Sequence, residues 1–228
     1  MDYKGLDRVL LYFKSFYLCI MNIQSAYNIW ANNYDEDKNL TRDLDAEIVR
    51  KVFSNQKFNS ILEVGCGTGK NTVFFASISN HLTAIDFSDK MISKAKEKVK
   101  SENVSFKIAD ITKDWDLEEN KFDLITFDLI LEHVETLTFI SEQAHKYLNS
   151  KGLVYINELH PFRQYDGKKA VYEENGETKE IDSFVHNISD FINSANKSGL
   201  KLLTLNEFWH EQDQNKLPRI ISLLFIKD

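Results

Sequence analysis

The sequence is poor in several features, and each scarcity excludes a class of protein. Two cysteines, Cys19 and Cys66, are too few for a disulfide framework and favour a reducing, cytoplasmic compartment. Two prolines in 228 residues make extended disordered linkers unexpected. A formal charge of −7 argues against a broad phosphate-binding surface, so we expect no nucleic-acid partner.

Long apolar runs are scarce too. The most apolar N-terminal stretch, residues 9–21, is short and is interrupted by Lys14. It is too short to cross a membrane, and no small-residue cleavage site follows it, so we expect an amphipathic helix and neither a membrane span nor a secretory signal. The total length fits one α/β domain with additions.

Glycine is rare, with eight in the chain, yet three of them fall at alternate positions between Ile61 and Gly69. A short apolar run precedes them, which predicts a strand, and residues 70–76 can continue as a helix. Glycines permit unusual backbone angles and close approach of a ligand, and a helix start offers free N–H groups. The pattern predicts a ligand-binding loop around Gly65, Gly67 and Gly69, with a tight turn that binds nothing as the alternative.

The spacing of these glycines separates two kinds of nucleotide-binding loop. The dinucleotide fingerprint requires its last glycine where this sequence has Lys70. Glu63-x-Gly65-x-Gly67-x-Gly69 instead resembles the cofactor loop of class I S-adenosylmethionine-dependent methyltransferases. The resemblance implies that this loop wraps the amino-acid and ribose portions of S-adenosylmethionine.

Strand and helix patterns alternate along the rest of the chain. Apolar runs predict strands at 81–85, 104–109, 122–127 and 153–159. Helical spacing is found at 88–100, at 188–199, and from residue 137 to a stop near Gly152. Residues 200–208 and 220–226 read as two strands joined by a polar loop, which predicts antiparallel pairing.

This alternation predicts a parallel sheet with helices on both faces. The resemblance implies a three-layer α/β/α, Rossmann-like fold whose seven-stranded, mostly parallel sheet has the order 3-2-1-4-5-7-6, with strand 7 antiparallel. We expect residues 1–41 to form an N-terminal helical lid or extension and residues 42–228 to form the methyltransferase domain. Residues 162–187 lack a clear period and are expected to be a substrate-side insertion that contains a small hairpin.

Acidic residues fall at the predicted strand ends, where open α/β sheets bind their ligands. Asp86 is expected to accept two hydrogen bonds from a ribose diol, with a helix-capping role as the alternative. The resemblance implies that Asp110 accepts from the adenine amino group, that Asp128 flanks the methionine portion, and that Glu63 lies near the cofactor's amino group. A turn-capping role is the alternative for Asp110. The other residues expected at the cofactor are Phe87, Met91, Ile111 and Leu129.

Residues 25–37 carry Tyr27, Trp30 and Tyr34 at helical spacing, which alone is typical of core packing. In the family that the chain resembles, such aromatic residues belong to a lid that closes over the cofactor. Because the recognisable sequence starts just after Met21, that residue is an alternative to Met1 as the natural start.

Two stretches that follow strands, residues 131–134 and 158–165, are expected to open toward the transferred methyl group. His133 is the first candidate general base and His160 the second, if the acceptor must lose a proton. Arg163 is expected to pair with a substrate carboxylate or phosphate. Tyr165 and His186 complete the expected substrate-binding set, and a structural role is the alternative for each histidine.

No metal is expected, because the cysteines and histidines lack spacings such as Cys-x-x-Cys. Cys66 belongs to the cofactor loop, where no activating base lies beside it in sequence, so we do not expect a nucleophile. The sequence thus predicts a cytoplasmic, S-adenosylmethionine-dependent methyltransferase of a small molecule. The alternatives are a methyltransferase of peptide or protein amines, a non-catalytic S-adenosylmethionine-binding module and an NAD-dependent dehydrogenase. The acceptor atom and the oligomeric state are not predicted.

Overall fold

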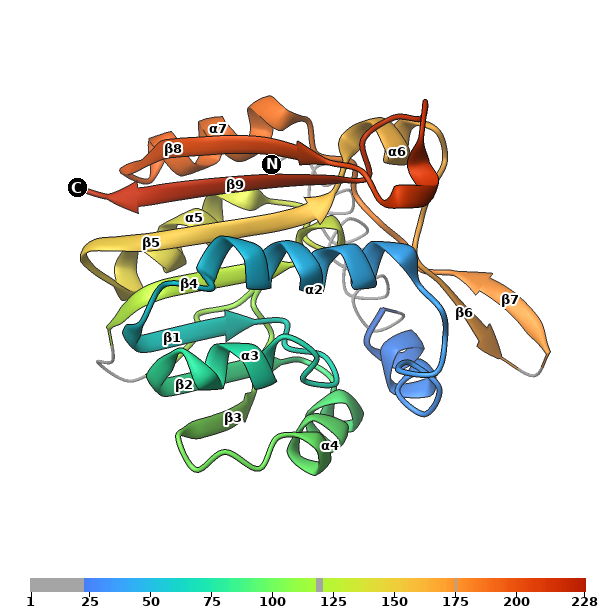
Figure 1. Ribbon diagram of the computed structural model, residues 1–228, viewed down its shortest axis with the longest axis horizontal. Helices are drawn as coiled ribbons and strands as arrows, with labels where there is room; N and C mark the ends of the chain where they lie inside the picture. The colour runs from blue at the N-terminus through green and yellow to red at the C-terminus, as the bar shows by residue number, and fades with distance from the viewer. Residues whose placement is uncertain (1–22, 118–120, 175) are drawn as a thin grey trace, which may run out of the picture.

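The computed structural model describes residues 23–117, 121–174 and 176–228. At its centre is a seven-stranded sheet (Figure 1). In sheet order the strands are β3 (Val104–Ile108), β2 (Ser79–Asp86), β1 (Phe58–Val64), β4 (Phe122–Asp128), β5 (Leu148–Leu159), β9 (Ile220–Lys227) and β8 (Leu200–Phe208). Strands β1 to β5 pair in parallel, and β9 runs antiparallel to both β5 and β8. The strand order implied by the resemblance, with its reversed strand, is confirmed.

Helices cover both faces of this sheet. In chain order the helices are α2 (Leu40–Phe53), α3 (Thr72–Ser77), α4 (Asp89–Lys98), α5 (Leu137–Tyr147), α6 (Pro161–Tyr165) and α7 (Ile188–Lys197), and there are 3-10 turns at η1 (Leu131–His133) and η2 (Glu211–Asp213). A separate antiparallel hairpin is formed by β6 (Val171–Glu174) and β7 (Glu177–Glu180), which confirms the predicted small hairpin. Figure 1 shows α2 on one face of the sheet and α5 with α7 on the other.

Strand β1 shows why both faces are covered. Ile61 packs with Val49 and Phe53 of α2, whereas its neighbour Leu62 packs in the cluster that holds Ile140 of α5. Successive side chains of a strand point to opposite faces, so a strand buried on both sides reads as one continuous apolar run. In β1 the run is interrupted by Glu63, and this short apolar run is the pattern from which the strand was predicted.

Three predicted helix ends differ from the structure. Helix α7 ends at Lys197, two residues before the expected end. Helix α4 ends at Lys98, two residues before the expected end, although Ser88 caps it as predicted by accepting a hydrogen bond from the Met91 N–H at 3.0 Å. The prediction that the helix from residue 137 stops near Gly152 is wrong, because α5 ends at Tyr147 and β5 begins directly after it.

The early start of β5 has a local cause. Leu148 pairs with Phe122 of β4, and the register of the two strands then shifts before the regular pairing begins. Lys151 takes a positive φ of 63° within this irregular stretch. Gly152 follows it, and a Cβ there would lie 2.9 Å from the backbone oxygen of Asn149. Gly152 therefore does not end a helix. It allows the irregular start of β5, where a side chain would not fit.

The predicted lid and the insertion pack together into one unit, which we call the cap: helical residues 23–30 and insertion residues 162–187. Ile23 and Trp30 of the lid share a small hydrophobic cluster with Tyr172 and Ile181 of the insertion. Figure 1 shows the lid helix and the hairpin at the carboxyl end of the parallel strands. The cap therefore adjoins the edge of the sheet where ligands are expected.

Some expectations fall beyond the described residues. The helix expected at residues 9–21, the choice between Met1 and Met21, and the position of Cys19 lie there. The division of the chain at residue 41 stays a prediction. Over the ranges that the structure describes, no helix is both long enough and apolar enough to cross a membrane.

Candidate functional site

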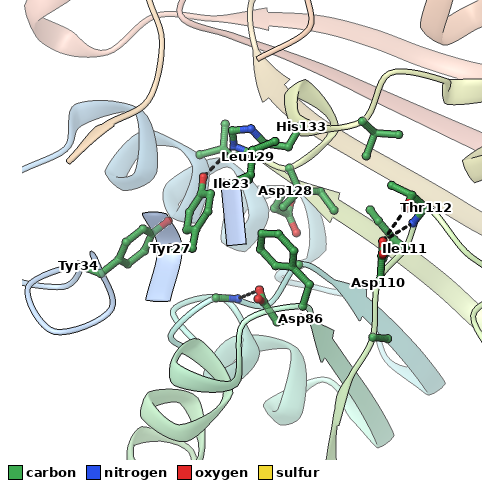
Figure 2. Close-up of a pocket in the computed structure, with 16 residues that line it drawn as sticks. Ile23, Tyr27, Tyr34, Asp86, Asp110, Ile111, Thr112, Asp128, Leu129 and His133 are labelled. Carbon is green, nitrogen blue, oxygen red and sulfur yellow. Dashed lines mark hydrogen bonds between the residues drawn. The ribbon is translucent and has the colours of Figure 1, made fainter. Parts of the chain in front are cut away.

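A pocket lies at the carboxyl ends of β1, β2, β3 and β4, beside the cap (Figure 2). The carboxyl ends of parallel strands meet at one edge, so residues far apart in sequence come together there. Its lining includes these predicted site residues: Tyr27, Tyr34, Gly65, Gly67, Asp86, Phe87, Asp110, Ile111, Asp128, Leu129 and His133. Val134, from the predicted stretch 131–134, lines it too, as do four residues that the sequence did not single out: Ile23, Ala109, Thr112 and Ile130.

The three alternating glycines have positive φ angles of 76°, 53° and 84° at Gly65, Gly67 and Gly69. A Cβ at Gly65 would lie 2.3 Å from Cγ2 of Ile130, so the loop needs the missing side chain there. A Cβ at Gly67 would meet nothing within 4 Å, whereas one at Gly69 would crowd Val99 at 3.1 Å. Gly65 and Gly67 thus line the pocket, and Gly69 permits close packing next to α4.

Asp86 joins the end of β2 to the glycine loop. Its Oδ2 accepts a hydrogen bond from the Gly67 N–H and its Oδ1 accepts one from the Ser88 N–H, both at 2.9 Å. Burial raises the pKa of this carboxyl to about 6, against the opposing effect of those bonds. Each carboxylate oxygen has a second lone pair, so Asp86 can hold the loop and still accept from a ligand.

Asp110 lines the same pocket from the segment after β3, the strand that neighbours β2 (Figure 2). Its Oδ1 accepts from the Thr112 N–H at 3.0 Å and from the Thr112 hydroxyl at 2.6 Å. Lys113 lies 2.9 Å from Oδ2. Burial opposes ionisation, but these bonds outweigh it and lower the pKa of the Asp110 carboxyl. Asp110 is therefore an ionised acceptor at neutral pH.

Asp128 ends β4 and points into the pocket (Figure 2). Both of its carboxylate oxygens are buried and have no hydrogen-bond partner among the described residues. Burial, followed by the nearby acids Asp45 and Glu63, raises its pKa well above the usual range. Leu129 follows with a positive φ of 58°, and its N–H donates to the backbone oxygen of Asn157 at 2.8 Å. The turn aims an unsatisfied carboxyl at the pocket.

The segment between β4 and α5, residues 129–136, is called the β4 loop. The lid contacts this loop through Tyr27 and His133. The Tyr27 hydroxyl lies 2.8 Å from Nε2 of His133 (Figure 2). Nδ1 of the same ring lies 3.1 Å from the backbone carbonyl oxygen of Asp182. Because the backbone carbonyl of Asp182 can only accept, Nδ1 carries the hydrogen, and in the neutral ring Nε2 then keeps its lone pair. The Tyr27 hydroxyl therefore donates to Nε2.

A buried acid from the predicted stretch 131–134, to which the sequence assigned no role of its own, lies beside this pair. Glu132 is 8% exposed, and its Oε1 lies 3.8 Å from Nε2 of His133. Its Oε2 accepts from Gln164 at 3.2 Å, and its backbone oxygen accepts from the Phe184 N–H at 2.7 Å. Both donors belong to the insertion, so the insertion holds the loop that carries His133.

The lid is also tied to the glycine loop. The Thr68 hydroxyl donates to Oδ1 of Asp35 at 2.7 Å, and Lys98 of α4 lies 2.6 Å from the other carboxylate oxygen. Tyr34 lines the pocket, with the Arg42 guanidinium 3.9 Å from the centre of its ring. These contacts fix the lid segment over the cofactor loop.

Several expected cofactor residues lie outside the pocket lining. Trp30 packs in the cap and donates to Asp37 at 2.6 Å. Cys66 is buried with Ile92 beneath the loop, and burial raises the pKa of its thiol well above the usual range, so the thiol stays protonated. Met91 is 1% exposed. Glu63 is 3% exposed, and burial raises the pKa of its carboxyl to about 8.

The structure does not bring His160 and Arg163 to the pocket. His160 is fully buried: its Nδ1 accepts from the Phe162 N–H at 3.2 Å, so its Nε2 donates to Glu207 at 2.9 Å. Burial lowers the pKa of its ring and outweighs the hydrogen bond and negative charge of Glu207, which act in the opposite direction. Arg163 pairs with the fully buried Asp213 at 3.0 Å. Both side chains hold α6 in place.

Tyr165 and His186 are also outside the lining. Tyr165 is 60% exposed and its hydroxyl bonds to Asn187. His186 is 8% exposed and its Nε2 lies 2.7 Å from the Val134 oxygen, so it supports the β4 loop from behind. Throughout the described part of the chain, no group of three or more His, Cys, Asp or Glu side chains is arranged to hold a metal ion.

Comparison with known proteins adds a family. A family model described as a methyltransferase domain matches residues 55–221. The chain is 29% identical over 137 residues to malonyl-[acyl-carrier protein] O-methyltransferase of Bacillus anthracis, covering 58% of this chain and 50% of that protein. It is 30% identical over 174 residues to phosphoethanolamine N-methyltransferase of Triticum aestivum, covering 71% of this chain and 34% of that protein. The chain spans about half the length of the curated relatives it matches.

Solved structures share the fold. A complex of DhpI with S-adenosylhomocysteine (SAH) matches with a TM-score of 0.72 at 19% identity, covering 90% of this chain and 95% of that one. At this identity the likeness establishes the fold alone.

Proposed function

The chain belongs to the class I S-adenosylmethionine-dependent methyltransferase family, and we propose that it transfers the methyl group of S-adenosylmethionine to a small-molecule acceptor. One observation carries the proposal. The glycine loop, three strand-end carboxyls and the Tyr27–His133 pair all face a single pocket.

The residues of the pocket fit this cofactor. S-adenosylmethionine carries a ribose diol, an adenine amino group, an ammonium and a sulfonium, all of which suit carboxylate partners. We propose that Asp86 accepts from the ribose, that Asp110 and Ile111 hold the adenine, and that Asp128 lies against the methionine portion. The two unsatisfied oxygens of Asp128 support the last assignment, because a buried carboxyl without a partner is costly.

When bound, S-adenosylmethionine supplies a methyl group attached to a positively charged sulfur. The protein has to hold the acceptor in line, keep water out, and take a proton where the acceptor has one to lose. The cap serves the first two tasks. Its residues Ile23 and Tyr27 line the pocket together with Ile130 and Val134 of the β4 loop, and these four side chains make the lining partly apolar.

His133 is the proposed proton acceptor. The Asp182 oxygen holds the hydrogen on Nδ1, which leaves the Nε2 lone pair directed at the Tyr27 hydroxyl. An acceptor hydroxyl or amine that takes the place of the Tyr27 hydroxyl would deliver its proton to Nε2. The Glu132 carboxyl, 3.8 Å from that nitrogen, would favour the positive charge that then forms on the ring.

The cap residues in the pocket lining support a small acceptor. The two relatives are named for different acceptors, a carrier-bound malonyl group and phosphoethanolamine. They support a small or carrier-bound acceptor without choosing between oxygen and nitrogen. We propose a small molecule whose hydroxyl or amine reaches His133 between the cap and the β4 loop.

Calorimetric titration of the full chain tests the cofactor half of this proposal. S-adenosylmethionine and SAH are expected to bind, and NAD is expected to give no heat of binding, because the loop has Lys70 where a dinucleotide site needs glycine. Binding of NAD without binding of SAH would overturn the proposal.

A further inference from the structure

Buried polar atoms without partners gather at one place in the described residues. Except for Asn103 Oδ1, every such side-chain atom lies in a region between α2, α3 and the ends of β1, β4 and β5. These atoms are Glu63 Oε2, Asn71 Oδ1, Thr72 Oγ1, Thr126 Oγ1, Asp128 Oδ1 and Oδ2, and Asn157 Oδ1. Native proteins satisfy nearly all buried polar groups, so such a concentration requires an explanation.

The strand pairing brings these groups together. Glu63 of β1 lies opposite Thr126 of β4, and Asp128 of β4 lies opposite Asn157 of β5. A third carboxyl enters from α2: Asp45 accepts from the Asn157 side chain at 2.6 Å and from the Asn71 side chain at 2.8 Å. We call Asp45, Glu63 and Asp128 the acid cluster.

The acid cluster is too crowded to be fully ionised. Asp45 is 5% exposed and Glu63 is 3% exposed, so neither charge is well solvated. Burial is the largest cause that raises the pKa of each of the three carboxyls, and their mutual repulsion adds to it for Glu63 and Asp128. In the ligand-free protein the cluster therefore carries protons at neutral pH.

The charges around the cluster do not remove this crowding. Asp86 of β2 and Glu158 of β5 add negative potential. Lys70 and Arg50 act favourably on Asp45, but Lys70 pairs with the exposed Asp43 at 2.6 Å and Arg50 donates to the Ala46 oxygen at 2.7 Å. A positive charge placed inside the pocket, against Asp128, would act on the cluster much more strongly.

We propose that the acid cluster is a proton-exchanging subsite, which gives up a proton when a cationic ligand enters the pocket. The inference rests on the proposed function, because S-adenosylmethionine is that ligand: its sulfonium and ammonium exceed its carboxylate by one positive charge. SAH lacks the sulfonium charge and is neutral overall. The cofactor therefore binds with release of about one proton at neutral pH, and SAH binds with release of less.

Calorimetry of the full chain measures the released proton directly. The enthalpy of binding S-adenosylmethionine is measured at pH 7 in phosphate and in Tris, whose ionisation enthalpies differ. Proton release makes the two enthalpies differ in proportion to the number of protons, and the difference is expected to be smaller for SAH. Equal enthalpies in the two buffers, with S-adenosylmethionine still bound, would overturn the inference and leave the proposed function intact. No binding of S-adenosylmethionine in either buffer would overturn the proposed function.

Two isosteric variants assign the proton. Asp45→Asn and Glu63→Gln replace carboxyls that lie outside the pocket lining with neutral groups that resemble the protonated forms. Each is expected to fold and to lower the number of protons released. Glu47→Gln, on the same helix as Asp45 but exposed, is the matched control and should release as many protons as the unaltered chain. If all variants release the same number of protons on binding S-adenosylmethionine, the acid cluster is not the source of the proton and the inference is wrong.

Discussion

The Tyr27 hydroxyl donates to Nε2 of His133 at 2.8 Å, although the two residues are 106 positions apart in the sequence. Burial raises the pKa of Tyr27 well above its usual range, so the phenol remains a donor at neutral pH. The backbone oxygen of Asp182 fixes the other ring nitrogen. His133 is thus the point where the lid, the β4 loop and the insertion meet.

Removal of the His133 imidazole is expected to slow turnover strongly. If His133 accepts the proton of the acceptor, His133→Ala should lower kcat by roughly 10²–10⁴-fold and leave SAH affinity almost unchanged. Tyr27→Phe removes the hydroxyl that the acceptor has to displace from Nε2, so it should lower the KM for the acceptor and change kcat much less than His133→Ala does. Steady-state kinetics with the identified acceptor measures both effects.

His81→Ala is the control for this prediction, since His81 is exposed near the opposite end of β2. It should leave both constants unaltered. If His133→Ala and His160→Ala both retain full turnover, neither histidine is a base in this reaction.

The Asp86 carboxyl is expected to hold the cofactor. Asp86→Ala removes the acceptor proposed for the ribose diol and the anchor of the Gly67 N–H, so SAH binding should weaken by roughly 1–3 kcal/mol. Calorimetric titration measures this change. Asp89→Asn, in the exposed first turn of α4, is the matched control. Equal affinity in Asp86→Ala and the unaltered chain would remove Asp86 from the site.

The sheet and its ligand edge could be predicted from the sequence because their signals are local. Alternating strand and helix patterns, three closely spaced glycines and acids at strand ends each occupy a few adjacent residues. The roles of His160 and Arg163 could not be predicted in this way. Their partners are Glu207 near the end of β8 and Asp213 in η2, which the fold brings back to α6.

Gly65 and Gly67 should differ in their tolerance of a methyl group. Alanine at either position has to adopt a positive φ, which costs about 1–2 kcal/mol. At Gly65 the new Cβ would also lie 2.3 Å from Ile130, and overpacking adds about 1–3 kcal/mol. Urea unfolding should therefore show Gly65→Ala to be less stable than Gly67→Ala. Equal losses would contradict the close packing of the loop against the β4 turn.

Asp213 should be a determinant of stability and of its dependence on pH. It is fully buried and accepts from Arg219 at 2.6 and 2.7 Å, and these bonds are the main cause that lowers the pKa of its carboxyl. Asp213→Asn leaves Arg163 and Arg219 without their counter-charge, so the free energy of unfolding should fall by about 3–5 kcal/mol at pH 7.

The sign of the pH effect follows from the lowered pKa. The stabilisation by Asp213 is fully present above the pKa of about 4 of an unfolded aspartate and is lost as the pH falls toward the folded value. The difference in the free energy of unfolding between Asp213→Asn and the unaltered chain should therefore become smaller below about pH 4. Urea unfolding at pH 7 and at pH 3.5 measures it, with the exposed Asp114→Asn as control. If the difference in the free energy of unfolding is the same at both pH values, the arginines do not stabilise an ionised Asp213 in the folded protein.

The acid cluster illustrates what a sequence pattern omits. Glu63 is visible as an acid within an apolar strand, but Asp45 reads as one polar position of an ordinary amphipathic helix. Only the packing of α2 over the ends of β4 and β5 brings Asp45 to Asn157. The pocket residues Ile130 and Val134 carry no chemical signal of their own. They belong to the site because they flank His133 in a turn that Glu158 holds by accepting from the Ile130 and Leu131 N–H groups at 2.8 and 2.7 Å.

Transfer of a labelled methyl group tests the central claim most directly. The full chain is incubated with methyl-labelled S-adenosylmethionine and an extract of its native host, which is then separated into small molecules and protein. The account predicts label in a small-molecule product that forms with the unaltered chain and not with His133→Ala. Label found only in the protein fraction, or in neither fraction while S-adenosylmethionine is bound, would contradict it.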